Sequence, residues 1–283
     1  MGASPLVSVV ITTFNRSDAL LAVLAGLALQ TDRNFEVIVA DDGSGVEHQR
    51  RLLDSAVAKQ LGVLHVWHPD VGFTASRVRN RGVAASRGTY IVLLDGDCVP
   101  ERDFIANHRR LAQAGCFVNG SRVLLSPKMS AEVCAGTQRI VGRGWAYWLA
   151  RRLAGDASKL TGLLRLPDWN GRTHRAFSWK GIRSCNMGVW KADYERVDGF
   201  DESFVGWGHE DADFVLRLHH AGLARKNGFC STEVYHLWHR EAARASESRN
   251  AQVVRDRMQT KAILPTSGYA QARPDDDAVI TRL

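Results

Sequence analysis

Tyr90-Ile91-Val92-Leu93-Leu94-Asp95-Gly96-Asp97 is the stretch that best predicts the fold of this 283-residue chain. Its five leading apolar residues are typical of a strand buried on both faces, as in the interior of a parallel sheet. A turn with two carboxylates follows the strand directly. Ligands of open α/β sheets bind beyond the carboxyl ends of the strands. The stretch therefore predicts an α/β protein with a site at Asp95–Asp97.

Apolar strands and helices alternate on both sides of this stretch. We predict strands at Leu6–Thr12, Phe35–Ala40 and Val63–His68, and helices at Ser17–Ala28, Glu47–Gln60, Thr74–Ser86 and Arg102–Ala114. The alternation indicates a Rossmann-like, mostly parallel sheet with helices on both faces. We therefore expect the polar clusters Thr12–Asn15, Asp41–Ser44 and Asp95–Asp97 to converge at one edge of the sheet.

The pattern becomes less regular after residue 117. We predict strands at Phe117–Leu125, Arg183–Trp190 and Cys230–Leu237, and helices at Ser130–Gly142, Ala146–Ala154, Ala212–Ala221 and Glu241–Lys261. Gly144–Arg183 holds four tryptophans among many basic residues, and we expect it to be an insertion over the sheet edge. Pro265–Leu283 contains three successive aspartates and is expected to be a loose tail.

The composition narrows the class of protein. The net charge of +7 suits a phosphate-rich ligand or an anionic surface, but no nucleic-acid-binding signature is present, so we expect no nucleic-acid partner. Five scattered cysteines without a CxxC pair favour reduced thiols. No basic leader precedes Leu6–Ile11, and no apolar run approaches the ~20 residues that span a bilayer. We therefore expect a cytoplasmic protein.

Asp95-Gly96-Asp97 is a candidate metal site, because two carboxylates separated by one glycine can turn toward one divalent cation. A turn at a strand end also favours Asp and Gly. The metal-site interpretation is therefore supported mainly by the expected position of the motif at the centre of the sheet. His236 and His239 lie near the end of another predicted strand and could add nitrogen ligands. Carboxylates with imidazole suit Mn²⁺ better than Mg²⁺.

The segment from Gly206 to Asp211, Gly-Trp-Gly-His-Glu-Asp, is a second candidate site. Glycine allows a ligand to approach closely, and Trp207 offers a flat face for a ring-shaped substrate. Carboxylates stand beside it, although acids also complement the dipole at the start of a helix. Both interpretations hold if a helix begins here, and Asp213 is expected to be an acid of that helix start only.

Two further groups could belong to a nucleotide pocket. A carboxylate of Asp41 or Asp42 could accept the N–H of a base such as uracil. The side chains that could line the same pocket are Thr12, Thr13, Phe14 and Asn15. Arginine pairs with phosphate bidentately, and we expect Arg79 to reach the site. The arginines at alternate positions beside it cannot share its helical face.

These motifs occur in the order and spacing of a known family. The segments Val9–Arg16, Val39–Ser44, Arg79–Gly82 and Leu93–Asp97 resemble the family 2 glycosyltransferases of GT-A fold. The segments Cys185–Gly188, Gly199–Glu202 and Gly206–Asp211 resemble the C-terminal module shared by β-1,4-galactosyltransferases and bacterial chondroitin-type polymerases. The resemblance covers residues 5 to 240. It fails at His209, where the galactosyltransferases carry glycine.

The resemblance implies one GT-A domain in two halves. Residues 1–117 would bind the nucleotide-sugar, residues 118–265 would bind the acceptor and carry catalysis, and residues 266–283 would be a flexible tail. Asp211 would be the catalytic base, and Glu210 would hydrogen-bond to a sugar hydroxyl. The expected donor-site residues are Thr12, Thr13, Phe14, Asn15, Asp41, Asp42, Arg79, Asp95, Gly96 and Trp207, with Asp42 favoured over Asp41 for uracil. The expected metal ligands are Asp97 and His236, with Asp95 near the ribose or the metal and His239 as a substitute.

The implied activity is inverting, metal-dependent transfer of a hexose or N-acetylhexosamine. The donor would be a UDP-sugar, and the acceptor a hydroxyl of a glycan or lipid-linked glycan in bacterial surface polysaccharide or glycoconjugate synthesis. Mn²⁺ is the expected ion, with Mg²⁺ as the alternative. An ordinary Asp pKa of about 3.9 would keep Asp211 ionised near neutrality.

Three alternatives stay open. The basic insertion at 144–183 could contact a membrane surface, or it could be a charged flap packed on the core. A sugar nucleotidyltransferase would be expected to carry a glycine-rich loop after the first strand, and Thr12–Arg16 contains no glycine. A non-catalytic carbohydrate-binding protein would keep Trp207 but would have little need of both Asp211 and a metal site.

Overall fold

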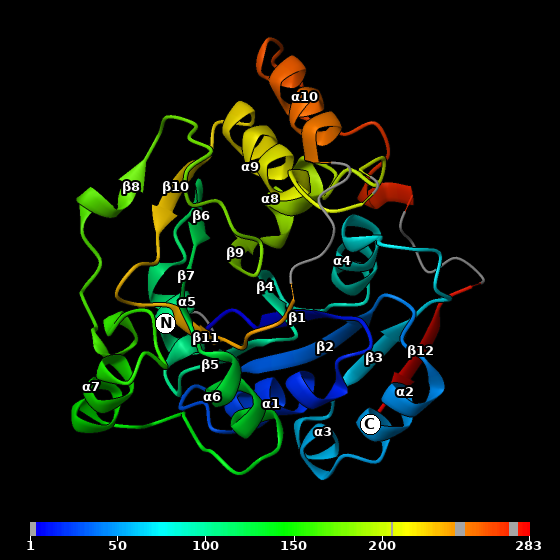
Figure 1. Cartoon of the computed structure of the whole chain (residues 1–283). Coiled ribbons are helices and arrows are strands. Elements are labelled where there is room, and N and C mark those ends of the chain that lie inside the picture. The colour runs from blue at the N-terminus through cyan, green and yellow to red at the C-terminus, as the bar shows by residue number, and fades with distance from the viewer. Residues whose placement is uncertain (1–3, 205, 241–246, 272–276) are drawn as a thin grey trace.

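The chain folds around a nine-stranded mixed sheet (Figure 1) with strand order β12-β3-β2-β1-β4-β9-β6-β10-β8. This computed structural model describes residues 4–204, 206–240, 247–271 and 277–283. The strands at the N-terminal side of the sheet are β1 (Val7–Thr13), β2 (Phe35–Asp41), β3 (Leu64–Trp67) and β4 (Tyr90–Asp95), and their mutual pairs are parallel. The α/β prediction is therefore confirmed.

The remaining strands extend this parallel group. They are β6 (Cys116–Asn119), β8 (Thr173–His174), β9 (Asn186–Trp190), β10 (Ala224–Asn227) and β12 (Val279–Arg282). β9 is antiparallel to both β4 and β6, β10 is parallel to β6, and β8 and β12 are antiparallel edge strands. Only β8, β9 and β12 of the nine strands therefore run against the others, and the sheet is mostly parallel as predicted.

The strand register brings the polar clusters together. Thr12 of β1 pairs with Asp95 of β4, and Thr13 pairs with Asp41 of β2. Because these are the carboxyl ends of neighbouring parallel strands, the expected convergence at one edge is confirmed.

Helices cover both faces of the sheet (Figure 1). One core contains side chains of α1 (Ser17–Ala28), α2 (Val46–Leu53), α3 (Ala56–Leu61), α5 (Phe104–Leu111) and α6 (Pro127–Cys134). The other contains side chains of α4 (Ala75–Ala84), α8 (Lys191–Arg196) and α9 (Glu210–His220). Val9 and Ile11 lie in the first core and Val10 in the second, because successive side chains of a strand point to opposite faces.

A second, three-stranded sheet contains the strand that ends at His236. Its order is β5 (Cys98–Pro100), β11 (Glu233–His236) and β7 (Ser121–Leu124). His236 pairs with Cys98, the residue that follows Asp97. The sheet therefore brings His236 next to the Asp95–Asp97 turn, although more than 130 residues of sequence separate the two.

The single strand predicted at Phe117–Leu125 is wrong. The strand is interrupted at Gly120, and the two pieces, β6 and β7, belong to different sheets. A β-carbon at residue 120 would lie 2.2 Å from the side chain of Asn186, and the Gly120 N–H donates to the Asn186 carbonyl at 2.8 Å. The close approach of these two backbones, which only glycine allows, ends the first strand.

Three predicted helices differ in extent. The helix at Glu47–Gln60 is divided into α2 and α3, because Ser55 caps α3 by accepting from the Ala58 N–H at 3.4 Å. The helix at Ser130–Gly142 is α6, which starts earlier behind the Ser126 cap and ends at Cys134. The C-terminal helix is α10 (Glu247–Met258), and residues 241–246 of its predicted range lie outside the described residues.

The prediction of a loose C-terminal tail is wrong for the part that the structure describes. η3 (Tyr269–Gln271) follows α10, and β12 adds an edge strand beside β3. Asp277 pairs with Arg81 at 2.8 Å and with Arg77 at 3.4 Å. Strand pairing fastens the end of the chain to β3, and the charge pairing fastens it to α4.

The basic, tryptophan-rich segment packs along the other side of the molecule (Figure 1). It contains α7 (Trp145–Leu153), η1 (Thr161–Leu163), η2 (Asn170–Arg172) and β8. The Trp148 ring stacks on Tyr235 of β11 at 4.3 Å between centroids. Within the described part of the chain, no helix is both long and apolar enough to cross a bilayer.

Candidate active site

The ends of β1 and β4 form a tight polar cluster. Thr12 Oγ1 donates to Asp95 Oδ1 at 3.0 Å, and the Gly96 N–H donates to the Thr12 carbonyl at 2.8 Å. A β-carbon at residue 96 would lie 2.8 Å from that carbonyl oxygen, so the turn requires glycine. Backbone packing thus explains why the middle residue of Asp95-Gly96-Asp97 is glycine. It does not require the two carboxylates to have the same role.

Arg79 joins this cluster to the second candidate site. Its guanidinium lies 3.3 Å from Asp95 Oδ1 and 3.2 Å from Glu210 Oε1, and the side chain is buried. Burial alone would lower the pKa of Arg79, but the carboxylates of Asp95, Glu210 and Asp211 outweigh burial and raise it. The arginine therefore stays charged and holds two distant segments of the chain together.

Asp97 faces both candidate histidines. Its carboxylate oxygens lie 3.7 Å from His236 Nε2 and 3.2 Å from His239 Nε2. Burial lowers the pKa of His236, which favours the neutral imidazole that can bind a metal. The structure thus brings Asp97 together with both histidines, and which of the two binds a metal stays a prediction.

Cys98 also lies beside this cluster, and sequence reasoning missed it. Ligand atoms of Asp97, Cys98 and His236 lie within 4.8 Å of one another. Burial raises the pKa of the Cys98 thiol well above its ordinary value, so the thiolate needed for metal binding is disfavoured. The better ligand set is therefore one carboxylate and two imidazoles, which fits Mn²⁺. Asp95 is less available, because Thr12 and Arg79 already contact its Oδ1.

The Gly-Trp-Gly segment has the backbone that its glycines suggest. Gly206, Gly208 and His209 have φ values of 77°, 107° and 69°. His209 is a left-handed residue at the N-cap of α9, so the glycine of the family pattern at this position has a conformational reason. The ring of Trp179, from the basic segment, packs edge-on against His209 at 5.4 Å.

Helix α9 begins at Glu210, two residues earlier than predicted. Glu210 and Asp211 consequently lie in its first turn, where the free N–H groups and the helix dipole favour carboxylates. Asp213 lies in the same turn but is fully buried and pairs with Arg217 at 2.8 Å and with Arg257. Asp213 is thus part of the scaffold, while Glu210 and Asp211 are partly exposed.

Asp211 has an unusual protonation equilibrium. Burial raises its pKa to about 7, with Glu210 adding to the rise and Arg79 opposing it. Its Oδ1 accepts the Ala212 N–H at 2.8 Å, and the Ser184 N–H also donates to the carboxylate. The expectation of an ordinary Asp pKa is therefore wrong, because the sequence does not show how deeply the carboxyl group is buried.

Asp41, the last residue of β2, and Asp42 after it are held by protein groups. Asp41 accepts from the Ser44 N–H at 2.8 Å and contacts His65 Nε2 at 3.0 Å. Asp42 accepts from the Thr74 N–H at 3.0 Å and from the Thr74 hydroxyl, and its Oδ1 lies 3.3 Å from His68 Nε2. Both oxygens of each carboxylate therefore have protein partners, and the contact of Asp42 with a base stays a prediction.

The loop after β1 lies beside these aspartates. The Asn15 side chain accepts from the Gly45 N–H at 2.8 Å, and the Asn15 N–H donates to Ser44 Oγ at 2.8 Å. Thr13 is buried, while the Phe14 ring is 46 % exposed. An exposed phenyl ring next to a polar strand-end cluster can stack on a planar ligand. Binding of a donor by the four predicted loop residues, Thr12 to Asn15, stays a prediction.

Arg122 is another residue that sequence reasoning missed. In the register of β7 with β11, Arg122 is opposite Val234 and Leu124 is opposite His236, so Arg122 and His236 point to the same face. Arg122 also contributes to the lowered pKa of His236, after burial and against the pull of Asp97. No sequence signal could reveal this neighbour, because it depends on a register between strands 110 residues apart.

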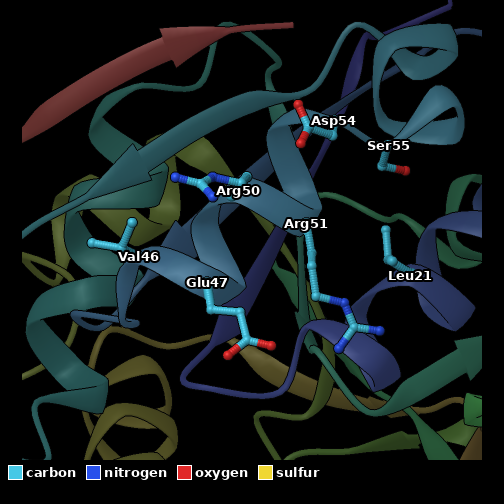
Figure 2. Close-up of a pocket in the computed structure, with 7 residues that line it drawn as sticks. All are labelled: Leu21, Val46, Glu47, Arg50, Arg51, Asp54 and Ser55. Atoms are coloured by element: carbon cyan, nitrogen blue, oxygen red, sulfur yellow. The ribbon is translucent and has the colours of Figure 1, made fainter.

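A surface pocket between α1 and α2 (Figure 2) is separate from these groups. It is lined by Leu21, Val46, Glu47, Arg50, Arg51, Asp54 and Ser55, none of which belongs to the predicted site. Its charged residues are of both signs. We therefore place the site at the strand ends and the start of α9.

Two family profiles match the chain. The profile of glycosyl transferase family 2 matches residues 8–128, and the profile described as the N-terminal domain of galactosyltransferase matches residues 170–240. The first match spans the strand-end cluster, and the second spans His209, Asp211 and His236. The two matches therefore meet at the site described above.

Curated relatives resemble most of the chain. Validoxylamine A glucosyltransferase of Streptomyces hygroscopicus subsp. jinggangensis is 31% identical over 235 residues, which are 77% of this chain and 52% of the relative. Chondroitin synthase of Escherichia coli is 28% identical over 254 residues, 83% of this chain and 34% of the relative. A PGL/p-HBAD biosynthesis glycosyltransferase of Mycobacterium bovis is 32% identical over 232 residues, 76% of this chain and 85% of the relative. The chain thus spans about half the length of the first of these relatives.

Solved structures share the fold. A mannosyltransferase of Pyrobaculum calidifontis in complex with GDP-Man and Mn²⁺ has a TM-score of 0.54 at 16% identity, over 91% of this chain and 62% of that chain. GalNAc-T7 with UDP, GalNAc and Mn²⁺ has a TM-score of 0.58 at 16% identity, over 84% of this chain and 44% of that chain. At such low identity these likenesses concern the fold alone.

Proposed function

This chain belongs to glycosyltransferase family 2, and on that premise we propose that it moves a hexose or N-acetylhexosamine from a UDP-sugar to a hydroxyl of a glycan or glycolipid, with inversion at the anomeric carbon. Family membership favours glycosyl transfer over the nucleotidyltransferase and the non-catalytic binding protein. We place the product among bacterial polysaccharides or glycoconjugates, because the similar proteins include a chondroitin synthase and a PGL/p-HBAD biosynthesis glycosyltransferase.

One observation carries the proposal: Arg79 contacts Asp95 and Glu210 at once. It links the strand-end cluster, where a nucleotide-sugar would bind, to the carboxylate pair Glu210–Asp211, where an acceptor would bind. A transferase needs these two subsites side by side, because the acceptor oxygen must reach the anomeric carbon while the donor is held. A binding module for either ligand alone would not need the link.

Asp211 is the proposed base. Its carboxylate takes the proton of the acceptor hydroxyl while that oxygen forms a bond to C1, and the bond between C1 and the phosphate oxygen breaks with its electron pair leaving on UDP. A base with a pKa of about 7 accepts this proton more readily than an ordinary aspartate. Glu210 would hold a sugar hydroxyl, and Trp207 would stack on a sugar face.

The donor would bind along the ends of β1, β2 and β4. Asp42 is proposed for the uracil N–H, because it is 7% exposed against 2% for Asp41, and a base would compete with its contacts to Thr74. Thr12, Thr13, Phe14, Asn15 and Gly96 would line the remainder of the nucleotide subsite. Arg79 contributes positive charge near the diphosphate while it positions Asp95 and Glu210.

Asp97, His236 and His239 would hold a divalent metal ion, with Asp95 at its edge. The fit rests on one carboxylate with two imidazoles nearby, a donor set that suits Mn²⁺ and admits Mg²⁺ less well. When bound, the ion supplies positive charge that stabilises the leaving diphosphate. Arg122, on the face of His236, is placed to add a further positive charge there.

The proposal is tested by a donor screen. UDP release is measured with UDP-glucose, UDP-galactose, UDP-GlcNAc and UDP-GalNAc, with and without Mn²⁺ and with candidate glycan acceptors. We expect release that needs both the metal and an acceptor, and a product extended by one sugar. Formation of a UDP-sugar from UTP and a sugar phosphate would instead identify a nucleotidyltransferase. Glycan binding without UDP release under any of these conditions would identify a binding protein.

A further inference from the structure

Helix α7 exposes an apolar side. Trp145, Leu149 and Leu153 are 53%, 49% and 81% exposed, and their spacing of four residues places them along one side of the helix. The side next to it is buried through Trp148, which is 1% exposed and stacks on Tyr235. A surface helix normally turns its apolar stripe toward the core, so α7 presents a second apolar stripe that the described residues do not cover.

The charges around this stripe are of one sign. Between Glu132 and Asp156 the chain has no acidic residue and four arginines, Arg139, Arg143, Arg151 and Arg152. Arg151 pairs with Asp156 at 3.2 Å. The other three are exposed, and their guanidinium groups have no carboxylate partner among the residues that the structure describes. The exposed stripe is therefore bordered by unneutralised positive charge.

This combination fits one kind of partner. An apolar helix side with a tryptophan, flanked by arginines, is typical of helices that lie in the plane of a membrane with anionic lipids. We propose that α7 is a membrane-docking helix, with Trp145, Leu149 and Leu153 in the interface and the neighbouring arginines on lipid phosphates. The nine residues of α7 are ~13 Å long, which suits shallow insertion rather than spanning.

The position of α7 connects docking to the site. α7 lies at the outer margin of the molecule, on the side away from α2, α3 and the C-terminus (Figure 1). Trp148 stacks on Tyr235, and the next residue in β11 is His236, which faces Asp97. A docked α7 would thus hold the site one helix and one strand from the lipid surface. The purpose of docking rests on the proposed function, since a transferase site so placed would serve an acceptor carried on a lipid.

The first experiment measures vesicle binding and needs no turnover. The whole chain is sedimented with sucrose-loaded vesicles of phosphatidylcholine alone, or with about one-third phosphatidylglycerol. We expect binding only to the anionic vesicles, and weaker binding as salt is raised. The variant W145S/L149S/L153S should bind at least ~10-fold more weakly, because it removes the apolar insertion. The variant R139Q/R143Q/R152Q should lose about fivefold for each charge removed.

A matched control changes exposed apolar residues elsewhere. Leu29, Val46 and Leu264 are 55%, 71% and 57% exposed, and none lies in α7. The variant L29S/V46S/L264S should bind anionic vesicles like the original chain. UDP release with a water-soluble acceptor should be unchanged in the α7 variants, so a failure of docking and a failure of glycosyl transfer are observed separately.

Three outcomes would overturn the inference. The first is absence of binding of the original chain to anionic vesicles, and the second is equal binding by W145S/L149S/L153S. The third is a dimer, measured by light scattering, that the serine variant dissociates while vesicles bind neither protein. That result would assign the stripe to a second copy of the chain.

Discussion

The two parts of the site are held by different means. At the ends of β1 and β4, Thr12 and Asp95 are opposite one another in a parallel ladder, so their backbones are fixed by sheet hydrogen bonds. The loop before α9 has no ladder. Its conformation depends on positive φ values and on side chains from elsewhere, such as Asn250, which donates to the Gly208 carbonyl at 2.9 Å.

This difference indicates that substitutions can disrupt the strand ends of β1 and β4 without disrupting the start of α9, and the reverse. A ladder tolerates the loss of one side chain, because the backbone keeps the register. A loop held by side chains moves when one of them is lost. Substitutions at strand ends should therefore change the binding of metal and donor, whereas substitutions in the loop and at the start of α9 should change the use of the acceptor, either its KM or the turnover.

The largest expected effect is at Asp211. Asp211→Asn should lower kcat by about 10³-fold, because the base is lost, while affinity for the UDP-sugar is retained. Calorimetric titration with the donor and steady-state kinetics separate the two quantities. Asp193→Asn is a matched control, since Asp193 also lies in the first turn of a helix with a pKa raised by burial but outside the site. Normal turnover in Asp211→Asn would refute the assignment of the base.

Asp97 gives the next largest effect, on the other side of the comparison. Asp97→Ala, or removal of metal with EDTA, should weaken UDP-sugar binding by about 10²-fold, because the carboxylate ligand is lost. Calorimetry with and without Mn²⁺ measures this change. Asp103→Ala, which removes the partner of Arg165, is the control. Unchanged metal-dependent affinity in Asp97→Ala would exclude its role as a ligand.

The pH profile should sharpen the comparison. Asp211 acts as a base only when ionised, so kcat should fall about tenfold per pH unit as pH decreases below its pKa of about 7. Donor affinity should not follow this curve. Because the folded-state pKa is raised, the proton on Asp211 stabilises the fold at low pH, and this contribution is lost as pH rises through 7. Asp211→Asn should therefore raise the melting temperature at pH 8 but not at pH 4, and an equal shift at both pH values would contradict this.

The smallest expected effect is at His209. His209→Gly should relieve the left-handed strain and stabilise the fold by about 1 kcal/mol, measured by urea denaturation. It also removes the contact with Trp179, so KM for the acceptor should rise a few-fold while donor affinity stays constant. Trp179→Phe keeps an aromatic edge and should change KM less. A change in donor affinity would show that the two parts of the site are not separable here.

Local chemistry explains most of what could be predicted. The strands of the parallel core, the helix at Ser17–Ala28 and the polar strand ends were predicted with errors of one or two residues, because each depends on apolar patterning or turn residues within a short segment. The break at Gly120 and the edge strand β12 were missed. Both depend on contacts with segments far away in sequence, Asn186 and β3 respectively.

The sequence by itself determined the α/β class, the order of the motifs and the residue types available for binding and catalysis. Only the tertiary structure decided that Arg79 links Asp95 to Glu210, that both histidines reach Asp97, and that α7 turns an apolar side outward. It also decided the pKa of Asp211. The physical reason is that register, burial and electrostatic environment arise between segments, and no local pattern encodes them.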